Sequence, residues 1–277
     1  MDPDRFEVVS FDSRQVYKFL EIGTAKPDSN LRSHIVHRLI DFLEPGEKIS
    51  AASFVRLANK EVEDVFSKKK IPIITCGTGF YLKAFLYGMY EIPPANEEIR
   101  KKLESLSKDE RWNMLKEFDP DAVIKINFND DYRVIRALET YQLSGKRWSE
   151  LKERSEDGFI SRRDIEIKGI FIEWNRDKLY ERINKRAKYI VDNGLLDETK
   201  LVAERFGMNC PALNSLGYNF ALENIYGSLS LDSLYEKFAQ SHRNYAKKQI
   251  TWFKKEEAIQ PLSWNETLDV LKNIERR

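Results

Sequence analysis

The sequence is poor in cysteine and histidine, and it has no long apolar run. Its two cysteines, Cys76 and Cys210, form no CxxC pair, and its three histidines are scattered. This pattern argues against a zinc site and suits a reducing compartment. No apolar stretch reaches the roughly 18 residues of a membrane helix, and the N-terminus lacks a charged-then-apolar signal sequence. We therefore expect a cytoplasmic protein that does not span a membrane.

An excess of charge of one sign is also lacking. The 277 residues contain 46 Lys and Arg against 45 Asp and Glu, a formal net charge of +1. That balance alone argues against nucleic-acid binding, because phosphate contacts need positive potential. The distribution is uneven, however: residues 242–255 (HRNYAKKQITWFKK) contain five Lys or Arg, three aromatic residues and no acid. This segment predicts a local basic patch suited to nucleic acid.

Apolar residues are plentiful enough for the core of one large domain, or of a domain that carries an insertion. In residues 1–92, the runs VVSFD and IPIITC are typical of buried strands. A helical pattern lies between them, with Ser50 or Ser53 as its N-cap, and a second helix follows the glycine turn at Gly79. This order of elements predicts an α/β fold whose parallel sheet collects functional groups at the carboxyl ends of its strands.

A helical insertion is predicted for residues 93–157. It opens at Pro93-Pro94 and contains four amphipathic patterns without a strand signal. Asp119-Pro120 and Asp130-Asp131 are typical helix starts. We expect an all-helical domain here.

Residues 158–277 are expected to return to the first domain. The alternating, β-branched pattern IEIKGIFIEW predicts a strand at residues 165–174. Long helices are predicted at about 176–206 and 231–255. The core is thus expected in two parts, residues 1–92 and 158–277, on either side of the insertion.

Asp12 follows directly after the first predicted strand and begins the string DSRQVY. A carboxylate at this point can face a site, and the polar residues after it can read the edge of a base. Asp12 or Ser13 could equally serve as a helix N-cap. Residue types alone leave both interpretations open.

The turn Gly77-Thr78-Gly79 lies between the second strand and a helix. Such a turn can offer backbone N–H groups, a helix N-terminus and a hydroxyl to an anion. Glycines are equally common in structural turns between a strand and a helix. A GTG turn by itself therefore leaves phosphate binding open.

Together with five further strings, these segments resemble the tRNA dimethylallyltransferases (isopentenyl-tRNA transferases). The strings EIGTAKP, HRLIDF, NDDYRVIRALE, LGY and AKKQITWF occur in that family's order and approximate spacing, and the resemblance covers essentially the whole chain. It implies an α/β fold with a P-loop-NTPase-like parallel sheet flanked by helices. It also implies that a dimethylallyl group passes from dimethylallyl diphosphate to N6 of adenine 37, beside the tRNA anticodon.

The resemblance assigns roles to individual residues. Asp12 would be the general base that takes a proton from N6, and Thr78 would donate a hydrogen bond to the oxygen that leaves with the diphosphate. Gly77 and Gly79 would contact the diphosphate, whose charge calls for cations, Mg²⁺ being the family's usual one. The resemblance also implies nucleotide binding, with ATP among the family's nucleotides. We expect a monomer that binds tRNA and no membrane.

A larger set of residues is expected to hold the anticodon stem-loop around the extruded adenine. Besides Asp12 and Thr78, these residues are Ser13, Arg14, Gln15, Arg100, Tyr132, Arg133, Val134, Ile135, Arg136, Lys247, Lys248, Gln249, Thr251, Trp252 and Lys254. Ser13 and Gln15 would read the base. Arg133 and Arg136 would share one helix face, although a solvated stripe is the alternative. Trp252 suits RNA stacking and core packing equally.

Four other cations receive less specific interpretations. Lys26 and Arg38 could contact phosphate or form structural ion pairs. Arg182 and Arg186 lie four residues apart among mixed charges, which is typical of ordinary helix surface.

One family feature has no counterpart in the sequence. The family's first strand leads into a phosphate-binding loop, GPTxSGK[ST], whereas MDPDRFE before the VVSFD strand contains neither glycine nor lysine. We expect either that the loop belongs to sequence upstream of Met1, or that the chain is a catalytically inactive homologue that binds tRNA. A transferase acting on free adenine nucleotide is a third interpretation, which the helical insertion disfavours.

Overall fold

A computed structural model describes residues 2–89, 92–151 and 158–276. The chain forms two compact units: residues 1–86 together with 162–277, and residues 87–161. We call them the α/β unit and the helical unit. The expected boundaries near residues 92 and 157 adjoin or fall on stretches outside the described residues.

The α/β unit contains all five strands of the described residues. They are β1 (Phe6–Phe11), β2 (His37–Arg38), β3 (Ile71–Cys76), β4 (Gly169–Ile172) and β5 (Ile259–Leu262). All pairings are parallel, as expected, but the strands form two sheets: β2-β1-β3 and β4-β5. In the first sheet, Phe11 is level with Cys76, so the residues after β1 and β3 leave the sheet side by side.

Helices cover both faces of β1, which is buried along its whole length. The helices of this unit are α1 (Ser29–His34), α2 (Ala51–Ser67), α3 (Gly79–Tyr87, whose last residue belongs to the helical unit), α8 (Arg176–Ile190), α9 (Leu196–Phe206), α10 (Tyr218–Ile225), α11 (Leu231–Phe253) and α12 (Trp264–Arg276). On one face, the Phe11 ring packs edge-on against Phe54 of α2 and Phe85 of α3, with centroids 5.3 and 5.0 Å apart. On the other face, Phe6 and Val8 pack with Ile274 of α12.

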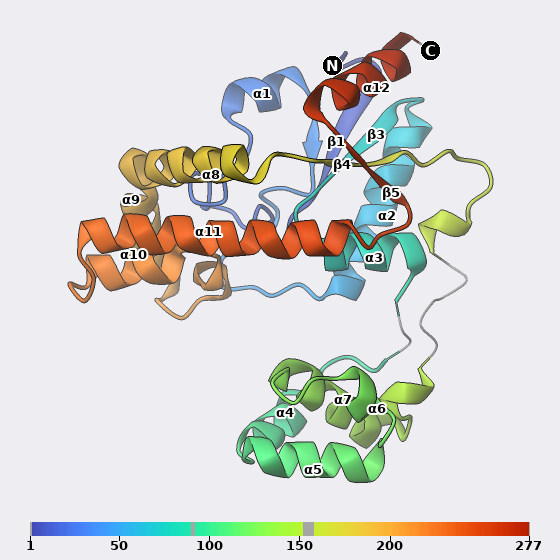
Figure 1. Ribbon diagram of the computed structural model, residues 1–277, viewed down its shortest axis with the longest axis vertical. Coiled ribbons are helices and arrows are strands. Elements are labelled where there is room, and N and C mark those ends of the chain that lie inside the picture. The colour runs from blue at the N-terminus through green and yellow to red at the C-terminus, as the bar shows by residue number, and fades with distance from the viewer. Residues whose placement is uncertain (1, 90–91, 152–157, 277) are drawn as a thin grey trace. The chain divides into compact units, whose positions relative to one another are not determined.

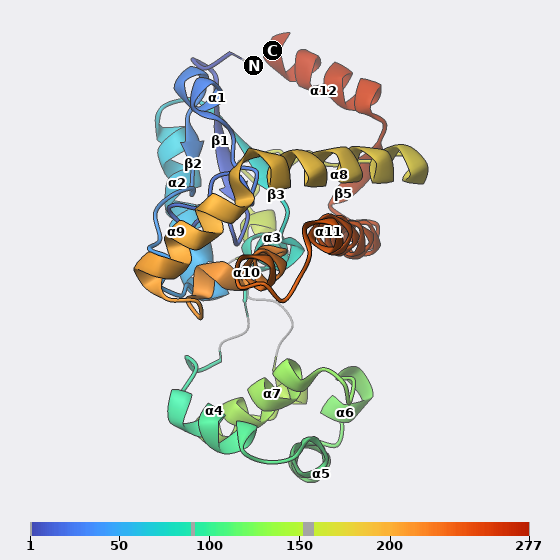
Figure 2. The ribbon, with the colours of Figure 1, turned by 90° about the vertical axis from the view of Figure 1, so that its left-hand side faces the viewer.

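Two long helices, α8 and α11, lie side by side next to the sheets (Figures 1 and 2). The α8 pattern does not continue to Phe206 as one helix, because a π-helical segment, Val191–Leu195, separates it from α9. Within this segment Gly194 has φ +119°, a conformation that favours glycine, and its neighbour Asn193 is also non-helical. The expected single helix is therefore two helices joined by a kink.

The helical unit contains the four predicted helices: α4 (Glu97–Glu104), α5 (Lys108–Phe118), α6 (Ala122–Lys125) and α7 (Asp131–Ser144). Asp130 caps α7 by accepting from Arg133 N, as the sequence predicts. Leu103, Leu115, Ile126 and Leu138 form the centre of its core. The unit is therefore a small helical domain with its own hydrophobic core.

Residues 158–277 depart from the prediction in one further respect. The strand expected at residues 165–174 is observed only at Gly169–Ile172. Gly169 allows β4 to approach β5 closely, since a Cβ at this residue would lie 2.2 Å from the Ala258 carbonyl oxygen beside β5. The predicted N-cap between β1 and β3 is Ser50, whose hydroxyl accepts from Ser53 N.

Candidate active site and nucleic-acid interface

Asp12 lies immediately after β1 and does perform the capping role. Its Oδ1 accepts hydrogen bonds from Arg14 N at 2.7 Å and from Gln15 N at 3.2 Å. Among the described residues, Oδ2 accepts none, and it faces Gly77, where a Cβ would lie 3.0 Å from it. The carboxylate is therefore oriented by one oxygen and open at the other, so capping and chemistry are compatible.

Thr78 follows β3 and lies against the same turn. Its Oγ1 accepts from Ser13 N at 3.1 Å and lies 3.3 Å from Ser13 Oγ. The N–H groups of Gly77 and Thr78 both donate to the Phe11 carbonyl oxygen. The parallel register of β1 and β3 thus brings Asp12 and Thr78 together, as the sequence predicts for strand ends.

The two glycines of this turn serve close packing. The Gly77 N–H is committed to Phe11, and a Cβ on Gly79 would lie 2.4 Å from the Trp252 ring. The Gly77 N–H is therefore not free to contact a diphosphate, and the contact expected of Gly79 stays a prediction. A Cβ at residue 79 would displace the Trp252 ring of α11, and a Cβ at residue 77 would press against the Asp12 carboxylate.

One face of α11 fastens the helix to this turn. Tyr245 Oη and Gln249 Nε2 both donate to the Gly77 carbonyl oxygen, at 2.7 and 2.9 Å. With Trp252 on Gly79, these contacts follow helical spacing. Gln249 and Trp252, two of the predicted RNA contacts, therefore hold the protein together, whereas Lys248 and Lys254 are exposed.

A cation that the sequence analysis set aside faces the site from α8. Partial burial lowers the pKa of Arg186, the Asp12 carboxylate opposes this effect, and Arg182 adds to it. Arg182 itself lies over the Trp174 ring, 4.5 Å from its centroid. Arg186 is exposed, as the sequence predicts for a helix surface, but its charge also interacts with Asp12. One local signal was available: Arg186 has no acid three or four residues away, unlike Lys185, which pairs with Glu181.

A buried carboxylate, Glu198 of α9, fastens the EIGTAKP loop. It accepts from three consecutive backbone N–H groups, those of Glu21, Ile22 and Gly23, and from Tyr218 Oη. A Cβ on Gly23 would lie 2.3 Å from that hydroxyl. The IGTAKP and LGY strings thus meet around one carboxylate.

This loop in turn holds Gln15, the predicted base reader. Gln15 Nε2 donates to the carbonyl oxygens of Thr24 and Ala25, at 3.4 and 3.3 Å, and its Oε1 accepts from Ser10 Oγ at 3.0 Å. The side-chain amide is therefore committed within the protein. Base reading by Gln15 would require these bonds to be exchanged.

Lys26 and Arg38 form structural ion pairs, one of the two alternatives for each. The buried Lys26 ammonium pairs with Asp41. Arg38 bonds Glu7 and Glu61 at 2.6 and 2.5 Å. Neither side chain is therefore left unpaired to bind a phosphate group.

In the helical unit, the predicted RNA contacts separate into two groups. Val134 and Ile135 are core residues, so the expectation that their side chains touch RNA is corrected. Arg136 is buried, where it pairs with Glu139 and donates to the Pro93 carbonyl oxygen. It therefore does not share an exposed stripe with Arg133, whose side chain is 61% exposed.

Arg100 also bonds Glu139, through Nε at 3.0 Å and Nη2 at 3.2 Å. Its guanidinium lies 6.0 Å from the centroid of the Tyr132 ring, which is 70% exposed. Tyr132 and Arg133 are thus the two predicted contacts on α7 that face solvent. An exposed aromatic ring beside two arginines suits stacking on a base.

Three observations concern a reactive thiol, a metal site and a membrane-spanning helix. Burial raises the pKa of the Cys76 thiol to about 12, so this residue beside the turn stays protonated at neutral pH. Within the described residues, no group of three or more His, Cys, Asp or Glu side chains could hold a metal ion. No helix in the same residues is long and apolar enough to cross a membrane.

Comparison with known sequences relates this geometry to one family. The IPP transferase family model matches residues 15–256. The tRNA dimethylallyltransferase of Leptospira interrogans is 46% identical over 275 residues, which cover 99% of this chain and 92% of that protein. The Leptospira biflexa tRNA dimethylallyltransferase is 44% identical over 278 residues, covering 100% of this chain and 93% of that one.

Solved structures agree with this relationship. The tRNA isopentenylpyrophosphate transferase of Staphylococcus epidermidis is 30% identical with a TM-score of 0.65, covering 98% of this chain and 91% of that chain. A eukaryotic dimethylallyltransferase acting on tRNA gives a TM-score of 0.77 at 25% identity, covering 93% of this chain and 67% of that one.

Proposed function

Because the chain belongs to the IPP transferase family, we propose that it is a tRNA dimethylallyltransferase. It transfers the dimethylallyl group of dimethylallyl diphosphate to N6 of adenine 37 in tRNA and releases diphosphate. The observation that carries this proposal at the level of residues is the pair of turns after β1 and β3. They point the open Oδ2 of Asp12 at Gly77 and bind the Thr78 hydroxyl oxygen to the N–H of Ser13, the residues next to Thr78 and Asp12.

In the proposed reaction, N6 attacks the first carbon of the dimethylallyl group while the bond from that carbon to the diphosphate oxygen breaks. Asp12 Oδ2 takes the N6 proton, since Oδ1 is held by two backbone N–H groups and fixes the carboxylate's direction. Thr78 donates a hydrogen bond to the departing oxygen, and Arg186 adds positive charge near the site.

Metal binding remains a prediction from the family. The described residues do not form a Mg²⁺ site made of protein side chains alone. Asp12 does not belong to any group of three or more metal-binding side chains among them. Mg²⁺ often binds through one or two carboxylates and the phosphates of the substrate.

RNA binding is proposed for the exposed members of the predicted set. These are Lys247, Lys248, Thr251 and Lys254 on and beside α11, and Tyr132 with Arg133 on α7, aided by the half-buried Arg100 and by the half-buried Arg14 near the active-site turn. Contacts around adenine 37 must offset the few kcal/mol that unstacking the base costs. Ser13 lies next to Asp12 and is proposed to contact the extruded base. A cytoplasmic location and a monomeric state remain predictions.

The test is an assay of the chain with dimethylallyl diphosphate, Mg²⁺ and unmodified tRNA that carries adenines at positions 36 to 38. Nucleoside analysis by mass spectrometry should detect N6-(dimethylallyl)adenosine. Asp12→Asn, which keeps an oxygen for the turn, should lower kcat roughly 100-fold or more, and Thr78→Val about 100-fold. Undiminished transfer by Asp12→Asn would exclude the proposed base. Stable tRNA binding without transfer would instead favour an inactive homologue.

A further inference from the structure

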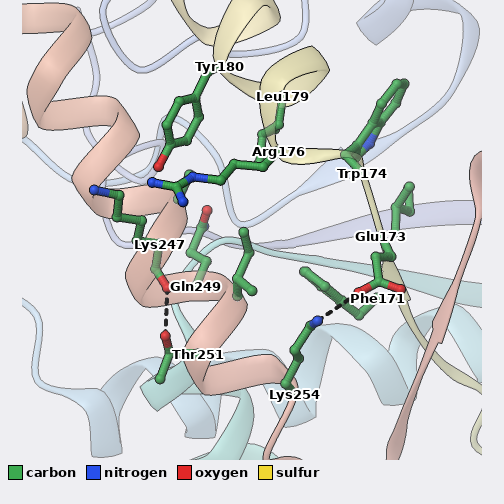
Figure 3. A pocket seen from close by; sticks show the side chains of 13 residues that line it. Phe171, Glu173, Trp174, Arg176, Leu179, Tyr180, Lys247, Gln249, Thr251 and Lys254 are labelled. Carbon is green, nitrogen blue, oxygen red and sulfur yellow. Dashed lines mark hydrogen bonds and ion pairs between the residues drawn. The ribbon is translucent and has the colours of Figure 1, made fainter.

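A pocket of about 630 Å³ lies beside the active-site turn, between the end of β4, the first turns of α8 and the last turns of α11 (Figure 3). Three cations line it, Arg176, Lys247 and Lys254, against one carboxylate, Glu173. The Lys254 ammonium lies 2.7 Å from Glu173 Oε1, so these two charges compensate each other. The lining therefore keeps a net positive charge, which comes from Arg176 and Lys247.

Arg176 and Lys247 have no ion-pair partner among the described residues, and both adjoin the Tyr180 ring. The guanidinium carbon of Arg176 lies 5.3 Å from the ring centroid, and Lys247 Nζ lies 6.0 Å from it. In Figure 3 the Tyr180 hydroxyl points toward the ends of these two side chains. Three hydrogen-bond donors of two helices thus converge in one place.

The Tyr180 hydroxyl itself lacks a partner. It is buried from solvent, and within the described part of the chain it has no hydrogen-bond acceptor; the Arg176 and Lys247 side chains beside it are donors. Buried polar atoms are rarely left unsatisfied, and each such atom requires an explanation. A bound group that accepts a hydrogen bond would provide one.

The electrostatics of Tyr180 favour an anionic acceptor. Burial by itself would raise the pKa of Tyr180, but Arg176 and Lys247 outweigh burial and lower the pKa. A phenol beside two cations is a strong donor to an oxyanion, since charge-assisted hydrogen bonds are stronger than neutral ones.

The N-terminus of α8 does not explain the positive potential. Asn175 Oδ1 already accepts from the backbone N–H groups of Asp177 and Lys178. The anion-binding groups are therefore side chains. Apolar walls from Phe171, Leu179 and Ile250 complete the pocket.

We propose that this pocket binds a phosphate group of the substrates, with Tyr180, Arg176 and Lys247 as its ligands. The proposal rests on the proposed function, because the phosphate belongs either to the diphosphate of the prenyl donor or to the RNA backbone. Gln249 connects the pocket to the active site, since it lines the pocket and donates to the Gly77 carbonyl oxygen. A phosphate held here would be fixed relative to the turn that contains Thr78.

The first experiment titrates the purified chain with inorganic diphosphate, and separately with inorganic phosphate, without RNA. Isothermal calorimetry at low ionic strength should detect binding. Tyr180→Phe should weaken it about fivefold, because one hydrogen bond to an anion is lost. Arg176→Met and Lys247→Met should each weaken it about tenfold. Lys178→Met, an exposed cation on α8 outside the pocket, is the matched control and should change binding less than about twofold.

The second experiment distinguishes the two sources of phosphate. If the donor diphosphate occupies the pocket, Tyr180→Phe raises the KM for dimethylallyl diphosphate and leaves the affinity for an anticodon stem-loop unchanged. If an RNA phosphate occupies it, the RNA affinity falls and the KM for the donor stays the same. Either result supports the phosphate site.

The proposal is overturned if wild type and all three pocket variants bind phosphate, diphosphate and RNA equally. Misfolding should not obscure this result, because Tyr180→Phe removes only an unpartnered oxygen; a thermal melt checks it. The binding of phosphate and diphosphate is measured in an assay that does not depend on transfer of the dimethylallyl group. A chain that binds diphosphate through Tyr180 but never modifies tRNA would retain the site and refute the proposed function.

Discussion

The two units use a buried carboxylate in opposite ways. In the helical unit, Glu139 is fully buried and binds two cations, Arg100 and Arg136. In the α/β unit, Glu198 binds three backbone N–H groups and the Tyr218 hydroxyl.

The difference determines where positive charge is available. Glu139 neutralises arginines that the sequence assigns to RNA, whereas Glu198 fixes a loop and uses no cation. Arg176 and Lys247 of the α/β unit have no acidic partner within the residues described. Local basic composition thus overstates the binding charge of the helical unit and understates that of the α/β unit.

The largest effect is expected for a substitution of Glu139, the buried carboxylate of the helical unit. We expect Glu139→Gln to lower the free energy of unfolding of the helical unit by about 3 kcal/mol, because two partly buried arginines lose their counter-charge. Urea denaturation followed by tryptophan fluorescence measures this, because Trp112 and Trp148 pack against the core of this unit. Glu150→Gln, an exposed carboxylate of the same unit, is the control and should have no measurable effect. Equal stability of both variants would mean that Glu139 does not organise this unit.

Glu198→Gln should have a smaller effect of about 2 kcal/mol, since an amide oxygen still accepts hydrogen bonds but lacks charge. We also expect slower transfer, because the loop that orients Gln15 loosens. Denaturation and kcat measurements check both effects. Glu204→Gln, on the same helix and exposed, should leave both unchanged.

Acid should weaken the α/β unit through Glu7. Burial raises the pKa of this carboxyl, but Arg38, Lys68 and Lys70 outweigh burial and place it below the ordinary value of 4.5. The folded-state pKa is therefore depressed, so the stabilisation is complete above pH 4.5 and is lost as pH falls through the folded-state value. Unfolding curves between pH 6 and 3 should show this loss, and Glu7→Gln should flatten it. If the stability of Glu7→Gln falls as steeply with pH as that of wild type, groups other than Glu7 cause the loss.

The smallest expected effects concern RNA. Arg133→Met should weaken stem-loop binding modestly and reduce the salt slope by about 1, because one phosphate contact is lost. Arg136→Met should instead act on stability with little change in the slope, since Arg136 is committed to Glu139. Filter-binding measurements at several salt concentrations distinguish the effects of the two substitutions. A reversed result would mean that Arg136 leaves Glu139 when RNA binds.

The sequence by itself determined the elements and the turn chemistry. Apolar runs located β1 and β3, periodicity located α2 and the four helices of the helical unit, and Ser50 and Asp130 cap helices as predicted. The pairing of Asp12 with Thr78 also followed, because parallel strands carry their carboxyl ends to one edge. These features depend on neighbouring residues, which a sequence displays directly.

Only the tertiary structure decided which polar groups remain free. Arg133 and Arg136 look alike in sequence, yet one is exposed and the other pairs with Glu139. Arg186 looks like helix surface, yet it faces Asp12, 174 positions earlier in the chain. The physical reason is that each partner comes from a distant element, and long-range packing alone determines whether a charge is compensated or left open to a substrate.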